Sequence, residues 1–162
     1  MKTKTRILGI DPGSITAGYG IIDVAGNKSN FIECGVIKPD TKNLGKKLAI
    51  IYRSVEELVL QFKPDEFVIE KVFVSKNPDS AIKLGQARGV AIAAAAIHEV
   101  PVFEYSANEI KKSVVGRGHA TKQEVQTMIT MLLNLGNQPD SDAADALSCA
   151  FCHGSIRTIY RR

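Results

Sequence analysis

Three apolar runs near the start of the chain indicate β-strands, at residues 6–11, 18–24 and 31–37. Gly26 and Asn27 lie between the second and third runs and are typical of a tight turn. Because tight turns join antiparallel neighbours, we expect the three strands to form an antiparallel meander.

The hydrophobic period then changes. From Leu44 to Phe62 apolar residues recur every three or four positions, which predicts an amphipathic helix that ends before Pro64. Residues 66–70 and 100–105 indicate two further strands, and the Ala-rich segment 80–98 between them predicts a helix. Such alternation is typical of parallel strands joined by right-handed crossovers.

Three more helices are expected in the remainder, at about 107–115, 121–133 and 142–152. No internal repeat or linker interrupts the pattern, so residues 1–162 are predicted to form a single mixed α/β domain. The residues from about 154 onward are predicted to form a short basic C-terminal tail.

Composition narrows the class of protein. Hydrophobic residues make up 44% of the 162 positions and charged residues 23%, which is enough for a core and excludes wholesale disorder. No apolar run is long enough for a transmembrane helix, and the three cysteines do not make a disulfide framework. The basic N-terminus leads into a strand-like run rather than a signal peptide. We therefore expect a soluble cytoplasmic protein with no membrane partner.

The net charge of +4 is unevenly distributed. Residues 111–122 contain no acid, and residues 153–162 carry Arg157, Arg161 and Arg162. Four cations lie in the first of these stretches: Lys111, Lys112, Arg117 and Lys122. Such patches attract polyanions such as DNA, although a solvated surface and a frayed tail are equally compatible with the pattern.

Four carboxylates fall where one site would need them. Asp11 and Glu70 end predicted strands, and sites in α/β sheets lie beyond the carboxyl ends of parallel strands. Asp142 and Asp145 are spaced to share one face of the last helix. Four like charges in one crevice require a cation, and oxygen ligands favour Mg²⁺. Alternatively, Asp11 forms a turn before Pro12, Glu70 is a loop acid, and the two helix acids are caps or solvated.

The sequence resembles the RuvC family of bacterial Holliday-junction resolvases, the crossover junction endodeoxyribonucleases. Matching motifs follow one another in family order over nearly the whole chain. They are residues 7–14 (ILGIDPGS) with 18–20 (GYG), Ile69-Glu70 with Val72-Phe73, 83–89 (KLGQARG), 114–116 (VVG) and 142–147 (DAADAL).

The resemblance implies a ribonuclease H-like fold, with a mixed five-stranded sheet and helices on both faces. It implies an endonuclease of DNA recombination and repair that nicks opposed strands of a four-way junction. Two Mg²⁺ ions, with Mn²⁺ as a substitute, would bind Asp11, Glu70, Asp142 and Asp145. A homodimer and a branch-migration helicase complex are the implied partners.

The resemblance also assigns residues beside the acids. Lys111 and Lys122 are the implied basic residues, with Lys122 contacting phosphate or the transition state. Phe73 is the implied aromatic near the junction centre, where it could stack on an unpaired base. The alternatives are a core position for Phe73 and a capping or surface role for Lys122. His119 has no assigned role, and His98 is expected to be structural.

Other functions fit the sequence less well. The segment 149–153 (CAFCH) matches a haem-attachment pattern but lies within a predicted helix, and Cys149 and Cys152 lack a second cysteine pair for zinc. Actin-like ATPases share a phosphate loop but need two such domains. An enzyme acting on RNA–DNA hybrids and a DNA-binding module with a degenerate site are the remaining rivals.

Overall fold

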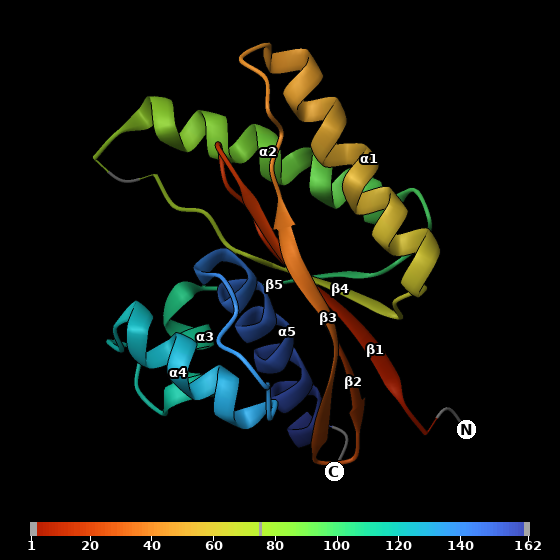
Figure 1. Cartoon of the computed structure of the whole chain (residues 1–162), viewed down its shortest axis with the longest axis vertical. Helices are drawn as coiled ribbons and strands as arrows, with labels where there is room; N and C mark the ends of the chain where they lie inside the picture. Colours follow the sequence, from red (N-terminus) through yellow and green to blue (C-terminus); the bar gives the residue numbers. More distant parts are fainter. Residues whose placement is uncertain (1–2, 75, 161–162) are drawn as a thin grey trace.

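The computed structural model describes residues 3–74 and 76–160. One sheet has the strand order β3-β2-β1-β4-β5 (Figure 1). Its strands are β1 (Thr5–Asp11), β2 (Ala17–Ala25), β3 (Lys28–Ile37), β4 (Glu66–Glu70) and β5 (Val102–Tyr105). The first three strands are antiparallel, whereas β4 pairs in parallel with both β1 and β5. The predicted meander and the predicted parallel part are both present.

Helices cover both faces of this sheet (Figure 1). They are α1 (Leu44–Phe62), α2 (Pro78–Ala96), α3 (Ala107–Val115), α4 (Lys122–Leu132) and α5 (Ser141–Tyr160). Because successive strand residues point to opposite faces, Leu8 and Ile10 pack with α1 and α2, while Ile7 packs with α3, α4 and α5. The predicted α/β class and the five-stranded mixed sheet are confirmed.

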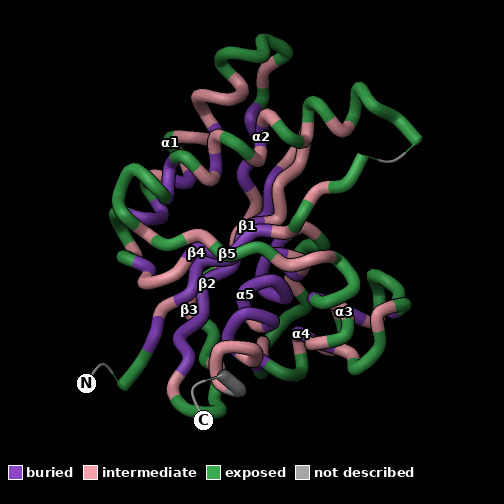
Figure 2. Tube along the Cα trace, turned by 180° about the vertical axis from the view of Figure 1, so that it is seen from behind, coloured by how far each residue is buried: buried purple, intermediate pink, exposed green. Residues whose placement is uncertain are grey.

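Buried positions are concentrated in the sheet and in α5, which crosses the middle of its face (Figure 2). The close approach of α5 depends on glycine. A Cβ at Gly9 would lie 2.3 Å from the carbonyl oxygen of Ala146, and one at Gly18 would lie 1.9 Å from that of Asp142. The glycines of β1 and β2 therefore set how near the start of α5 lies to the sheet.

The last helix continues beyond its predicted end at residue 152, so the stretch from about 154 to Tyr160 is helical rather than a tail. Arg157, assigned from the sequence to a basic patch, instead has a side chain that is only 14% exposed and donates to Oε1 of Glu66 at 2.8 Å. His153 Nε2 lies 2.8 Å from Oε2 of the same carboxylate. This pairing with β4 fastens the end of α5 to the sheet. Arg161 and Arg162 lie outside the described residues.

The same network is electrostatically satisfied. Burial alone would raise the pKa of Glu66, but hydrogen bonds from His153 and Arg157 lower it below its ordinary value. His153 Nδ1 in turn lies 2.7 Å from the hydroxyl of Tyr105 on β5. Helix α5 is thus fixed to two parallel strands at the end remote from Asp142.

Other boundaries shift by a few residues. Strand β3 begins at Lys28 because its pairing with β2 continues to the Gly26 turn, where Lys28 opposes Ala25. Helix α2 begins at Pro78, with Asn77 as N-cap accepting from the Ser80 backbone. These are local effects of a hairpin and a cap, and they leave the predicted order of elements unchanged.

Candidate active site

The site is built on the carboxyl ends of two neighbouring parallel strands. Asp11 is the last residue of β1 and Glu70 the last residue of β4. The preceding residues, Ile10 and Ile69, are paired in register, so the two acids leave the sheet side by side. Both isoleucines are fully buried, which fixes the strand ends.

The first turns of α5 bring two further acids to the same place. Asp11, Glu70, Asp142 and Asp145 all line one cavity of about 530 Å³. Its remaining wall comes from the loop after β1, from α2, α3 and the start of α4. The structure thus brings together all four carboxylates that the sequence placed at strand ends and on one helical face.

Burial and the crowding of like charge raise the pKa values of Asp11 and Glu70. The pKa of Asp11 is raised to about 8, first by burial and then by the charges of Asp145, Glu70 and Asp142. The pKa of Glu70 is also raised, by burial and by Asp145, against the opposing effect of Lys111 and Lys122. The pocket therefore disfavours full ionisation of its carboxylates at neutral pH.

The donor set suits a hard divalent cation. The side chains lining the cavity include four carboxylates and no histidine or cysteine, and Mg²⁺ prefers oxygen over nitrogen or sulfur. Within residues 3–74 and 76–160, no three acidic, histidine or cysteine side chains lie close enough together to coordinate one metal ion. The four acids line the wall of the cavity instead, as expected for carboxylates that repel one another. They fit a cation because its charge would relieve this repulsion.

The basic stretch divides into two parts. Lys111 and Lys122 line the acidic cavity, and Lys122 Nζ lies 3.5 Å from Oδ2 of Asp145. The charge of Asp145 raises the pKa of Lys122, which keeps the lysine protonated. Lys112 is exposed in the last turn of α3, and Arg117 pairs with Glu124; neither lines the cavity.

Phe73 lies in the segment that follows β4, three residues after Glu70. Its side chain is 70% exposed, so the alternative of a core position is wrong. Val74 beside it is 78% exposed, so two neighbouring apolar side chains of this segment face solvent. The segment is available for contact with a ligand.

Two residues that bind the site acids were not singled out from the sequence. Thr16 donates through Oγ1 to Asp142 Oδ2 at 2.6 Å. Arg88 donates through Nε to the backbone carbonyl of Glu70 at 3.0 Å. Arg88 lies in the motif at residues 83–89, so the sequence could have indicated it as a site residue. Thr16 lies between two motifs, and only the fold brings it to Asp142.

The cysteine and histidine alternatives find no support. Cys149 and Cys152 are buried in α5, and both ring nitrogens of His153 lie within hydrogen-bonding distance of Tyr105 or Glu66. Both nitrogens of His153 are therefore already engaged, and neither is left for haem iron or zinc. His98 contacts Glu56 at 2.9 Å, in keeping with a structural role, and His119 is exposed.

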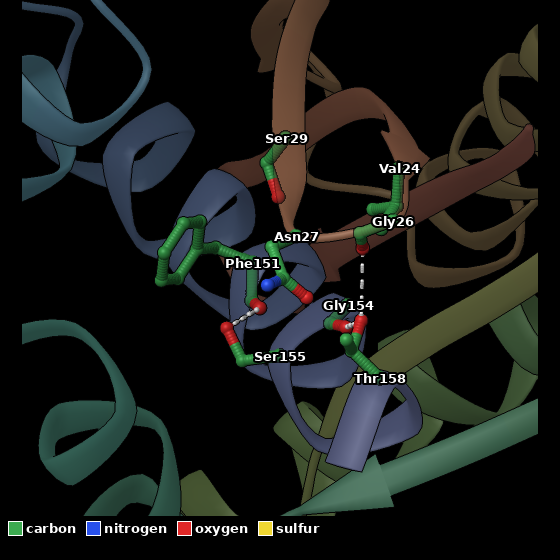
Figure 3. A pocket seen from close by; sticks show the side chains of 8 residues that line it. All are labelled: Val24, Gly26, Asn27, Ser29, Phe151, Gly154, Ser155 and Thr158. Atoms are coloured by element: carbon green, nitrogen blue, oxygen red, sulfur yellow. Dashed lines mark hydrogen bonds between the residues drawn. The ribbon is translucent and has the colours of Figure 1, made fainter. Parts of the chain in front are cut away.

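A second cavity, of about 350 Å³, lies beside the β2–β3 turn and the later half of α5 (Figure 3). Thr158 spans it, with Oγ1 donating to the carbonyl of Gly154 and lying 3.3 Å from that of Gly26. None of its lining side chains is ionisable: Val24, Gly26, Asn27, Ser29, Phe151, Gly154, Ser155 and Thr158. It therefore lacks ionisable side chains for acid–base catalysis.

Comparison with known proteins places this chain in a family. Residues 7–153 match the family described as crossover junction endodeoxyribonuclease RuvC. The chain belongs to the RuvC family. That span includes all four acids of the cavity.

The part of the chain that the structure describes contains no helix with both the length and the apolar content needed to cross a membrane.

Individual relatives extend the likeness over nearly the whole chain. The crossover junction endodeoxyribonuclease RuvC of Idiomarina loihiensis is 57% identical over 152 residues, covering 91% of this chain and 85% of that protein. A structure of Thermus thermophilus RuvC is 31% identical with a TM-score of 0.86, and T. thermophilus RuvC in complex with Holliday junction substrate has a TM-score of 0.90. In both, 96% of each chain is covered.

Proposed function

We propose that this RuvC-family chain is a crossover junction endodeoxyribonuclease that resolves four-way DNA junctions by paired nicks, in recombination and repair. The observation that carries the proposal is the cavity where Asp11, Glu70, Asp142 and Asp145 converge beside Lys111 and Lys122. Family membership supports the substrate class, since T. thermophilus RuvC was solved in complex with Holliday junction substrate.

The four carboxylates would hold two Mg²⁺ ions, for which Mn²⁺ can substitute. Such a pair of ions activates water and stabilises the leaving oxygen of a phosphodiester. The protein's own contribution is to fix the acids on β1, β4 and α5 and to place the Lys122 ammonium beside Asp145. That ammonium would offset charge developing on the scissile phosphate.

DNA contacts would divide according to side-chain chemistry. Lys111, Lys112 and Arg117 would contact phosphates, which fixes position without reading sequence. Phe73 would stack on an unpaired base at the junction centre, and its 70% exposure supports this role. Binding would therefore depend on salt mainly through the cations.

A homodimer would supply two equivalent sites for a substrate of near two-fold symmetry. Helix α2 supports this, because Gly85, Gly89, Ala93 and Ala96 form an exposed stripe of small residues along one side. A Cβ at Gly89 would meet no atom within 4 Å of its own chain. We expect Gly89→Leu to shift sedimentation from dimer to monomer without unfolding the chain. The control Glu57→Leu, on the exposed side of α1, is expected to leave the dimer intact.

We infer a cytoplasmic location from the composition of the sequence, and a branch-migration helicase complex as partner from the family resemblance. Fractionation of cells and co-purification with the helicase complex on junction DNA would test the two.

The function is tested with three substrates. The protein is incubated with a four-way junction, a linear duplex and an RNA–DNA hybrid, each with Mg²⁺ and with EDTA. We expect cleavage of the junction alone, only with Mg²⁺, and products that DNA ligase can seal. Cleavage of the hybrid would favour the ribonuclease rival, and junction binding without cleavage would favour a DNA-binding module.

A further inference from the structure

The hydroxyl of Thr16 holds one oxygen of a site carboxylate. Thr16 Oγ1 donates to Asp142 Oδ2 at 2.6 Å, across a sequence separation of 126 residues. An O–H to carboxylate distance of about 2.5–2.7 Å is typical of strong, charge-assisted hydrogen bonds. Both residues line the acidic cavity, so the bond lies at the site itself.

Tight packing on both sides fixes the loop that carries Thr16. A Cβ on Gly13 would lie 1.8 Å from the carbonyl oxygen of Thr16, and one on Gly18 would lie 1.9 Å from that of Asp142. Lys47 Nζ also donates to the carbonyl of Ser14 at 3.0 Å. The loop turns Thr16 inward, while its neighbour Ile15 is 78% exposed. The hydroxyl and the start of α5 are therefore held at a set separation.

A carboxylate with one oxygen fixed in this way loses most of its rotational freedom. Carboxylates that ligate metals are commonly oriented by such hydrogen bonds, and loss of the partner lowers metal affinity. Like charge in the cavity would otherwise favour turning Asp142 away from Asp11, because the two carboxylates repel. The hydroxyl opposes that movement without adding charge.

We propose that Thr16 is a positioning residue, which orients Asp142 for binding of a divalent cation. The inference rests on the proposed function, since it assigns the orientation of one acid of the same site. It adds a residue from the β1–β2 loop, on no motif that carries the family resemblance. Loss of the Thr16 hydroxyl should therefore lower the affinity for metal and leave the affinity for DNA unchanged in the absence of metal.

Three variants test the role. Thr16→Val removes the hydroxyl and keeps the shape, Thr16→Ser restores the hydroxyl, and Thr127→Val is a matched control on the exposed side of α4. Mn²⁺ binding to DNA-free protein is followed by loss of the free-ion electron paramagnetic resonance signal. Junction cleavage is titrated with Mg²⁺, junction binding is measured in EDTA, and melting is measured in EDTA.

We expect Thr16→Val to weaken Mn²⁺ binding and to raise the half-saturating Mg²⁺ concentration for cleavage, each by about 10-fold or more. Thr16→Ser and Thr127→Val are expected to stay near wild type. Junction binding in EDTA is expected to be the same for all four proteins.

Unchanged metal affinity in Thr16→Val would overturn the inference, as would failure of Thr16→Ser to restore it. A large loss of melting temperature in EDTA, for Thr16→Val but not Thr127→Val, would assign Thr16 a structural role instead. Wild-type protein that binds no Mn²⁺ and cleaves no junction would refute the proposed function, and the inference with it. The wild-type protein thus tests the proposed function, and the Thr16 variants test the positioning role.

Discussion

Nζ of Lys122 lies 3.5 Å from Oδ2 of Asp145, so the first turn of α4 contacts the first turns of α5 across the acidic cavity. The lysine is 76% exposed, whereas the aspartate is 26% exposed. An exposed ammonium beside a recessed carboxylate is poorly placed to stabilise the fold and well placed to meet an incoming phosphate.

Lys122→Gln separates these roles. We expect the single-turnover cleavage rate to fall by about 100-fold, as for loss of one group that stabilises developing charge. We expect the free energy of unfolding to change by less than ~1 kcal/mol, because exposed ion pairs contribute little. Lys112→Gln, which changes an exposed lysine outside the cavity, is the control for quench-flow and urea measurements. Equal rates for the two variants would remove Lys122 from the chemistry.

Asp142→Asn is expected to abolish cleavage and to preserve junction binding, because phosphate contacts come mainly from Lys and Arg. Cleavage is measured on gels with Mg²⁺, and binding by mobility shift in EDTA. Asp140→Asn changes a neighbouring exposed acid that does not line the cavity and is expected to leave both unaffected. Joint loss of binding and cleavage in Asp142→Asn would contradict this division.

Asp11 is expected to make the metal-free protein less stable as pH rises. Its folded pKa, about 8, lies above the ordinary value of 3.8. The folded state therefore holds the proton more tightly, and its stabilising effect is lost as pH rises from about 4 to about 8. The slope is at most about 1.4 kcal/mol per pH unit.

Urea unfolding in EDTA at intervals from pH 5 to 8 measures this dependence. Asp11→Asn is expected to flatten it, because the amide does not titrate, whereas Asp40→Asn, at an exposed position, is expected to leave it unchanged. A wild-type protein with no loss of stability over this range would mean that the acids are less crowded than the structure indicates.

Arg157 is expected to stabilise the fold through Glu66. Arg157→Met leaves the carboxylate, whose side chain is 14% exposed, without the guanidinium that donates to it. Breaking such a pair costs about 3 kcal/mol. Arg53→Met at an exposed position of α1 is the control, and urea unfolding is the measurement. A change of similar size in both variants would show that the ion pair is not responsible.

Lys111 and Lys112 are adjacent in sequence but differ in place, since only Lys111 lines the cavity. We expect Lys111→Ala to lower the slope of log affinity against log salt by about 0.9, the value for one lost phosphate contact on duplex DNA. Lys112→Ala is expected to have the smaller effect. Mobility shifts at several salt concentrations in EDTA give both slopes, and a larger effect of Lys112 would shift the DNA path away from the cavity.

The sequence by itself determined the elements and the edge of the sheet at which the acids lie. The bounds of α1, β4 and α3 agree with those predicted, because the period of apolar residues and the breaks at Pro64 and Gly116 are local signals. Asp11 and Glu70 could be placed together because parallel strands end at one edge. The sequence could not show that the face of α5 carrying Asp142 and Asp145 packs against that edge.

Tertiary structure decided the partners of individual side chains. Arg157 was assigned to a basic tail because nothing near it in sequence is acidic, yet Glu66, 91 residues away, receives its hydrogen bond. Thr16 meets Asp142 across 126 residues of sequence, and the absence of a side chain at Gly18 lets α5 approach β2 closely enough for this contact. Local periodicity selects helices and strands, but a hydrogen bond between distant residues depends on how those elements pack. The orientation of the site acids is therefore a property of the packed fold.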